Sequence, residues 1–338
     1  MLSRVVATVA GMVGFERKTL QANNGTIEYV EAGEGPLVIF CHGFPESWYS
    51  WRHQLPAVAD AGYRAVALSM RGYGNTTSPQ DVDRYTAMDV IGDVVGATNA
   101  LGADTAVVVG HDWGAPIAWW SALVRPDLFR AVAALSVPLP PPVGSLPDGL
   151  SVTALMQMAA GEDRDYYRLY FGEPGKAEAE LEADVDRSVR GFMYTISGNA
   201  VADGHEPWDG HFPAGERFVD QLVVPAELPA WLTEDDIAFY VGELERTGFR
   251  GSLNWYRNLD RIPGSLAPWL GARIRQPACY IGGTTDLIAG NTPEGLAAMR
   301  VGLADLRVEL MIEGAGHWIQ QERPDAVNEA LIGFLADL

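Results

Sequence analysis

Asp112 stands in a short motif that is typical of a nucleophile. The motif is Gly110-His111-Asp112-Trp113-Gly114. It starts at the last residue of the apolar run 105–110 and precedes a segment with helical spacing of apolar residues. A small residue two positions before and two after the central side chain is the pattern of a nucleophile elbow, a sharp turn from strand to helix. Glycines are required because so tight a turn leaves no space for larger side chains. An aspartate after a strand is also a common helix N-cap, so the motif alone leaves both interpretations open.

Two further residues with acid–base side chains stand at corresponding places along the chain. Asp286 follows the apolar run 277–281, and His317 follows the apolar run 307–312. A single aspartate or histidine in a loop usually has a structural role, but the chain order nucleophile, acid and histidine matches a catalytic triad. Because the carboxyl ends of parallel strands meet at one edge of a sheet, we predict that Asp112, Asp286 and His317 form one catalytic site.

A loop after a fourth apolar run completes the predicted site. The segment His42-Gly43-Phe44-Pro45 follows the run 36–41. Folds that combine a nucleophile elbow with this triad order have an oxyanion-binding loop after a strand at this place. We predict that the backbone N–H groups of Phe44 and Trp113 donate to a developing oxyanion. The rest of this loop is predicted to line the substrate-binding site. A plain turn is the alternative interpretation.

An aspartate nucleophile points to a different reaction from that of a serine. Serine attacking an sp3 carbon would leave an unreactive ether, whereas a carboxylate forms an alkyl ester whose carbonyl group water can attack. The predicted substrates are therefore epoxides or alkyl halides, with His317 as the base that activates water and Asp286 as the residue that orients His317. An epoxide releases a basic alkoxide and needs a proton donor such as tyrosine, whose reference pKa is about 10, whereas a halide leaves as a stable anion.

The elements that must position these residues alternate between strands and helices. Nearly continuous Val, Ile, Leu and Ala predict parallel strands that are covered on both faces, with helices as the crossovers between them. The predicted strands are 36–41, 64–70, 105–110, 131–137, 277–281 and 307–312, and the predicted helices are 89–101, 115–124 and 324–338. This order predicts an α/β fold with a mostly parallel, doubly wound sheet.

The alternation stops after Val137 and resumes only towards the C-terminus. The segment between contains Pro-rich turns, many aromatic residues and an acidic helical stretch at 177–190. We predict that residues 138–268 form a mainly helical cap inserted into a core made of residues 1–137 and 269–338. Such a cap would lie above the carboxyl ends of the strands, where open α/β sheets bind their ligands.

The composition argues against several classes of function. The 24 Lys and Arg against 44 Asp and Glu give a formal net charge of -20, which opposes binding to the phosphate backbone of a nucleic acid. Six histidines without ligand spacing and no glycine-rich nucleotide loop predict that neither a metal ion nor a cofactor is needed. Cys41 and Cys279 lie in apolar runs, so no disulfide framework is expected and a cytoplasmic location is predicted.

Membrane association is not expected either. The apolar N-terminal segment 1–15 is too short to span a bilayer and lacks the features of a secretion signal. It is predicted to be a helical or strand-like extension packed on the body. No later apolar stretch reaches the length of a membrane span. The sequence leaves the oligomeric state open, a homo-oligomer included.

With these motifs identified, the sequence resembles the soluble epoxide hydrolases of the α/β-hydrolase fold, both bacterial and mammalian. The resemblance extends from about residue 25 to the C-terminus and is dense at 42–52, 110–114 and 316–320. It implies an enzyme that uses water to convert small apolar epoxides to vicinal diols, as in detoxification, through an alkyl ester at Asp112.

The resemblance also implies two proton donors in the cap. Members of this family hydrogen-bond the epoxide oxygen with two cap tyrosines, and the matching stretches 167–175 and 248–258 place them at Tyr167 and Tyr256. Other tyrosines lie beside Tyr167, so a shift of register and a role in the core stay alternatives. One position departs from the family pattern, because Ser69 stands where relatives commonly carry an acidic residue.

Two other functions stay open. A haloalkane dehalogenase of the same fold shares the aspartate nucleophile, the tryptophan after it and the cap, but many dehalogenases have a halide-binding asparagine at the position of Phe44. The paired tyrosines also favour epoxides. A small-molecule receptor on this fold would bind without turnover, since a fold does not determine function, but the complete triad argues against that interpretation.

Overall fold

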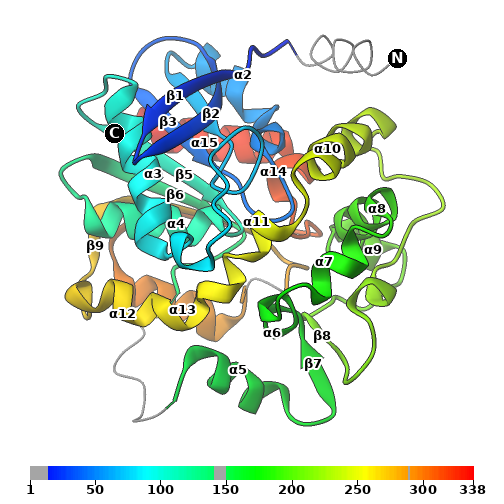
Figure 1. Cartoon of the computed structure of the whole chain (residues 1–338). Coiled ribbons are helices and arrows are strands. Elements are labelled where there is room, and N and C mark those ends of the chain that lie inside the picture. Colours follow the sequence, from blue (N-terminus) through cyan, green and yellow to red (C-terminus); the bar gives the residue numbers. More distant parts are fainter. Residues whose placement is uncertain (1–13, 141–149, 288–289) are drawn as a thin grey trace.

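An eight-stranded, mostly parallel sheet crosses the centre of the molecule (Figure 1). The computed structural model describes residues 14–140, 150–287 and 290–338. In spatial order the strands are β1 (Lys18–Ala22), β2 (Gly25–Ala32), β4 (Arg64–Leu68), β3 (Leu37–Cys41), β5 (Ala106–His111), β6 (Phe129–Leu135), β9 (Ile274–Gly283) and β10 (Leu303–Ile312). β1 pairs antiparallel with β2, β2 pairs antiparallel with β4, and every other neighbouring pair is parallel. The α/β fold that the sequence predicts is confirmed.

All six predicted strands are present, with their ends shifted by a few residues. The hairpin of β1 and β2, however, is not predicted. Its turn is formed by Asn23 and Asn24, whose φ angles are 49° and 59°. This left-handed conformation at both central residues is typical of two-residue hairpin turns and is tolerated by asparagine. The sheet therefore has an antiparallel edge in addition to its parallel centre.

Two pairs of helices cover the two faces of the sheet (Figure 1). α3 (Ala87–Ala100) packs beside α4 (Gly114–Val124), and α2 (Gln54–Asp60) packs beside α15 (Pro324–Ala336). α4 is buried along most of its length because it lies against β5 and β6. This packing holds the start of α4, and with it the Asp112 turn, firmly over the sheet.

The chain between β6 and β9 forms an inserted, mainly helical segment (Figure 1). Its elements are α5 (Val152–Ala160), β7 (Arg164–Tyr166), α6 (Tyr167–Gly172), α7 (Lys176–Leu181), α8 (Val185–Thr195), α9 (Gly198–Ala202), β8 (His211–Pro213), η3 (Phe218–Gln221), α10 (Glu234–Thr247), α11 (Arg250–Leu253), η4 (Tyr256–Arg261), α12 (Ile262–Leu266) and η5 (Ala267–Trp269). The acidic stretch 177–190 contains two helices, because Asp184 is not helical and caps α8 by accepting from the Arg187 N–H. The boundaries of the predicted cap at residues 138 and 268 stay predictions.

Ser69, the departure from the family pattern, contacts a buried carboxylate from a neighbouring strand. Its hydroxyl donates to Glu28 Oε2 on β2 at 2.8 Å, and both side chains are fully buried. Glu28 also accepts from the Asn75 N–H at 3.2 Å. An acidic residue at position 69 would place a second carboxylate against Glu28, and the two like charges would repel each other. The acidic group at this point of the fold is therefore supplied by β2.

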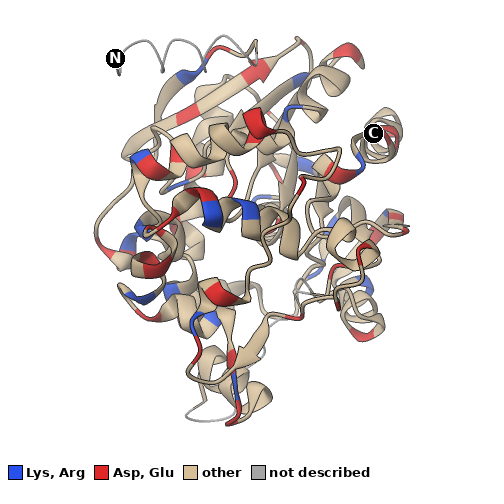
Figure 2. Cartoon of the chain, turned by 90° about the vertical axis from the view of Figure 1, so that its right-hand side faces the viewer, with Lys and Arg blue, Asp and Glu red and all other residues tan. Residues whose placement is uncertain are grey.

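The prediction for residues 1–15 lies outside the described residues except for its last two positions. Of these, Phe15 packs edge-on against Trp48, with ring centroids 6.1 Å apart. No helix within the described ranges is long and apolar enough to cross a membrane. Figure 2 shows Lys and Arg positions interspersed with Asp and Glu positions on one side of the molecule.

Candidate active site

Asp112 lies in a sharp turn between β5 and α4. Its φ angle of 51° is in the left-handed region, which residues other than glycine rarely adopt. A Cβ atom at Gly110 would lie 2.0 Å from the carbonyl oxygen of Gly114, and one at Gly114 would lie 2.0 Å from the carbonyl oxygen of Cys41. The turn thus has no space for side chains at either glycine, as the elbow motif predicts.

The structure brings Asp112, Asp286 and His317 together. His317 Nδ1 lies 3.0 Å from Asp286 Oδ2, and His317 Nε2 lies 3.5 Å from Asp112 Oδ2. Each residue follows the carboxyl end of a strand, and these strands, β5, β9 and β10, lie in the same half of the sheet. Asp286 and His317 are buried. The histidine therefore lies between the two carboxylates with one ring nitrogen toward each.

The charges of this cluster shift the pKa values of two of its members. Burial by itself lowers the pKa of His317, but the charge of Asp286 and the hydrogen bond and charge of Asp112 outweigh it and raise the pKa to about 10. Burial raises the pKa of Asp112, but His317 and the Phe44 N–H outweigh it, so this pKa lies below its ordinary value. At neutral pH an ionised Asp112 therefore faces a protonated His317.

The loop after β3 holds the Asp112 carboxylate from the other side. The Phe44 N–H donates to Asp112 Oδ1 at 2.7 Å. A Cβ atom at Gly43 would lie 2.2 Å from the same oxygen, so glycine is required for this approach. The Phe44–Pro45 peptide bond is cis. The Phe44 N–H lies against the Asp112 carboxylate, and Trp113 stands between Asp112 and the start of α4.

His42 supports this loop from within the core. Its Nδ1 donates to the Gly43 carbonyl at 2.9 Å, and its Nε2 accepts from the Met70 N–H at 3.0 Å. Burial lowers the pKa of His42 to about 4, so the ring is neutral at physiological pH and can accept a hydrogen bond. His42 is completely buried. His42, predicted to belong to the substrate-binding loop, contacts Gly43 within that loop and Met70 just after the end of β4.

A buried polar network supports the backbone of His317. His111 Nε2 donates to the His317 carbonyl at 2.8 Å, and His111 Nδ1 lies 2.7 Å from Glu46 Oε2. Ser136 also donates to that carbonyl, at 2.7 Å. The other oxygen of Glu46 accepts from Gln320 and Gln321. Sequence reasoning missed this network, although Glu46 directly follows the predicted oxyanion loop and His111 directly precedes Asp112.

Glu322 links the loop that contains His317 to the inserted segment by hydrogen bonds. Its carboxylate accepts from the N–H groups of Gly316, Trp318 and Gly198, at 3.0, 3.1 and 2.9 Å. Gly198 begins α9, so one buried side chain bridges the core and the inserted segment. The His317 N–H adds a second link by donating to the Ile196 carbonyl at 2.8 Å. Hydrogen bonds to neighbouring side chains and backbone therefore orient His317 on several sides.

Tyr167 and Tyr256 enter the site from the inserted segment. Their ring centroids lie 6.0 Å apart, and both line a small cavity together with Asp112, His317 and Phe44. Both side chains are buried. Other tyrosines beside Tyr167 have partners elsewhere, because Tyr166 stacks on His211 and Tyr170 donates to Glu180. Tyr167, and neither Tyr166 nor Tyr170, therefore lines the cavity that Asp112 also lines.

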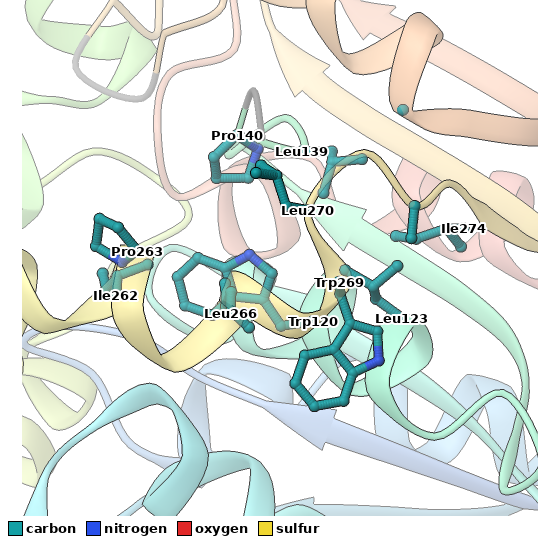
Figure 3. A pocket seen from close by; sticks show the side chains of 12 residues that line it. Trp120, Leu123, Leu139, Pro140, Ile262, Pro263, Leu266, Trp269, Leu270 and Ile274 are labelled. Carbon is teal, nitrogen blue, oxygen red and sulfur yellow. The ribbon is translucent and has the colours of Figure 1, made fainter. Parts of the chain in front are cut away.

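A larger apolar cavity of about 210 Å³ extends from Asp112. Its walls include Trp113, Val152, Met156 and Leu259. Trp120, Pro140 and Ile262 also line a second apolar cavity of about 70 Å³ (Figure 3), whose walls do not include Asp112. An ionised carboxylate, a histidine and two phenols at the end of an apolar cavity can attack an electrophilic carbon and protonate the oxygen that leaves it.

Comparisons with known proteins agree with this arrangement. A model of the alpha/beta hydrolase fold matches residues 36–176. Epoxide hydrolase A of Mycobacterium tuberculosis is 42% identical over 323 residues, which are 95% of this chain and 97% of that protein. Bifunctional epoxide hydrolase 2 of Sus scrofa is 37% identical over 91% of this chain, which matches 53% of that protein. The structure of an epoxide hydrolase from an endophytic Streptomyces superposes with a TM-score of 0.89 and 45% identity, over 96% of each chain.

Proposed function

The chain belongs to the epoxide hydrolase family of the α/β-hydrolase fold, and we propose that it converts epoxides to vicinal diols through an alkyl ester at Asp112. The observation that carries this proposal is the site geometry. The Asp112 carboxylate is held by the Phe44 N–H at 2.7 Å and lies 3.5 Å from His317, and it shares one cavity with Tyr167 and Tyr256.

The first step forms the ester. A carboxylate oxygen of Asp112 attacks one ring carbon of the epoxide, the bond from that carbon to the ring oxygen breaks, and a cap tyrosine donates its proton to the leaving alkoxide. The tyrosine becomes a tyrosinate. Asp112 is suited to this step because its lowered pKa keeps it ionised at neutral pH, and the elbow turn exposes it to the cavity.

Ester formation converts His317 from a cation to a base. The ester at Asp112 carries no charge, so His317 loses one of the two carboxylates that raise its pKa. Its pKa then falls, and its proton can pass to the tyrosinate. Asp286, 3.0 Å from Nδ1, remains to orient the ring. Neutral His317 is the form that can accept a proton from water.

The second step hydrolyses the ester. His317 takes a proton from a water molecule, and the resulting hydroxide attacks the ester carbonyl. The N–H groups of Phe44 and Trp113 are proposed to stabilise the oxyanion that develops. Collapse releases the diol alkoxide, which takes the proton of the newly formed Asp112 carboxyl group. The site thereby returns to an ionised Asp112 beside a protonated His317, the charge state from which the first step began.

The inserted segment and the cavity suggest the kind of substrate. We assign residues 138–268 to a cap that covers the core. The substrate-binding loop below this cap includes His42, Gly43 and Pro45. The cavity walls around Asp112 are predominantly apolar, so a small apolar epoxide fits them better than a charged one.

Product analysis with three substrates separates this proposal from its alternatives. Wild-type protein is incubated with styrene oxide, bromobutane and an activated aryl ester, and diol, halide and acid are measured. We expect the diol as the main product. Halide release without diol formation would indicate a haloalkane dehalogenase. The leaving halide needs no proton, so the two tyrosines would then have no role as proton donors. Binding without any turnover would indicate a receptor.

A further inference from the structure

Arg168 is a cavity residue that neither the triad nor the tyrosine pair includes. It follows Tyr167 in α6 and lines both cavities that reach Asp112. Its Nε donates to the hydroxyl oxygen of Tyr167 at 3.0 Å. Its guanidinium carbon lies 5.6 Å from the ring centroid of Tyr167 and 6.0 Å from that of Tyr166. A positive charge therefore lies directly against one of the two proposed proton donors.

The guanidinium has no carboxylate partner within 4.0 Å among the residues that the structure describes. The hydrogen bond to Tyr167 is also the only one that it donates to another described residue. The Arg168 side chain is partly buried at the edge of the cavity. Within the described residues, its one side-chain hydrogen bond is therefore directed at a hydroxyl in the site and not at a carboxylate.

The hydrogen bond determines what the Tyr167 hydroxyl can do. A phenol has one proton to donate, and its oxygen can accept from other groups. Because Tyr167 accepts from Arg168, its own proton stays available for the epoxide oxygen. When that proton leaves, the tyrosinate that forms lies beside the guanidinium, whose charge stabilises it. The cation thus favours the state that exists after proton transfer.

Tyr256 has no equivalent partner in the described residues. Its ring packs edge-on against Trp113, Phe44 and Phe171, at centroid distances of 5.2, 5.6 and 5.1 Å. Burial raises the pKa of Tyr167 and that of Tyr256. At Tyr167 the charge and the hydrogen bond of Arg168 both oppose this rise, whereas at Tyr256 only its charge does so, after larger effects of Asp112 and two tyrosines. The two cap tyrosines are therefore not electrostatically equal.

We infer that Arg168 is a positioning residue that makes Tyr167, rather than Tyr256, the principal proton donor to the epoxide oxygen. This inference rests on the proposed epoxide hydrolase function. In the step concerned, the O–H bond of Tyr167 breaks, the O–H bond of the leaving alkoxide forms, and the tyrosinate pairs with the guanidinium. Tyr256 then has the secondary role of holding the epoxide oxygen by a hydrogen bond.

A double-mutant cycle tests the inference. The rate of ester formation is measured by rapid quenching and intact-protein mass spectrometry in single turnovers of styrene oxide. The variants are Arg168→Met, Arg168→Lys, Tyr167→Phe, Tyr256→Phe, and Arg168→Met combined with each Tyr→Phe change. Arg187→Met, an exposed arginine of α8, is the matched control. Circular dichroism confirms that each variant is folded.

Arg168→Met is expected to slow ester formation on the order of tenfold. Arg168→Lys, which keeps the charge, should recover part of that loss, and Arg187→Met should have no effect. In the Tyr167→Phe background, Arg168→Met should cause no further loss, because the group through which it acts is gone. In the Tyr256→Phe background the full loss should persist. Tyr167→Phe alone should slow ester formation by roughly 100-fold, and Tyr256→Phe by less.

A second substrate gives a readout that a merely structural role would not change. An epoxide with a trifluoromethyl substituent releases a less basic alkoxide and needs less help from an acid, so the Arg168→Met loss should shrink with it. Equal losses with and without Tyr167, or with both substrates, would overturn the inference. Since wild-type protein must first form the diol, failure of the proposed function would be seen separately, as no diol at all.

Discussion

Replacing Asp112 with alanine is expected to lower diol formation by roughly 10⁴- to 10⁶-fold, the loss seen when a nucleophile of a catalytic triad is removed. The variant keeps the cavity but has no group that can form the alkyl ester. Phe44 N–H and His317 both lose the oxygen atoms that they face in the wild type. Diol formation is measured by chromatography over the full course of the reaction.

Asp127→Ala provides the matched control for this change. Asp127 is an exposed aspartate that pairs with Arg125 on the surface, outside the site, so its removal should leave turnover unchanged. Circular dichroism should show that both variants are folded. If Asp112→Ala keeps more than about one hundredth of the wild-type rate in preparations free of host hydrolases, another group is the nucleophile.

Replacing His317 with glutamine is expected to stop the reaction after its first step. Glutamine cannot take a proton from water, so the ester at Asp112 should accumulate and diol turnover should fall by roughly 10²- to 10⁴-fold, the contribution of a general base. Intact-protein mass spectrometry should show one added substrate mass for each chain. Peptide mapping should place that mass on the peptide that contains Asp112.

The pH of this experiment follows from the electrostatics of the site. In the wild type, the hydrogen bond and charge of His317 lower the pKa of Asp112. His317→Gln removes both, so the pKa of Asp112 rises and less of it is ionised in acid. The incubation is therefore made at about pH 8, well above the ordinary carboxyl range. His205→Gln, at an exposed position of the inserted segment, is the control that should not accumulate an adduct. An unmodified His317→Gln protein after such incubation would contradict the two-step mechanism.

The residues at strand ends were predictable because their positions follow from simple patterns. Asp112, Asp286 and His317 each follow a buried apolar run, and parallel strands bring such positions to one edge. The two glycines of the elbow could also be predicted from the local sequence, because the turn itself has no space for side chains at Gly110 and Gly114. These features required only the order of residues along the chain.

The features that were missed depend on contacts between distant segments or on weak local patterns. β1 and β2 lie at the edge of the sheet, where half-buried residues give little apolar signal. Glu28 and Ser69 meet only because of the pairing between β2 and β4. Arg168 looks like any polar residue of a short helix until the fold places it in a cavity with Asp112. No periodic pattern in the sequence indicates these contacts between distant segments.

The most direct test of the covalent mechanism is a single turnover in H₂¹⁸O, with the protein in excess over styrene oxide. If water attacks the carbonyl of the Asp112 ester, the first diol carries an oxygen from Asp112 and no ¹⁸O, and the label appears in the peptide that contains Asp112. That is the result we expect. Diol labelled in the first turnover, with an unlabelled Asp112 peptide, would show that water attacks the epoxide directly and would contradict an alkyl ester at Asp112.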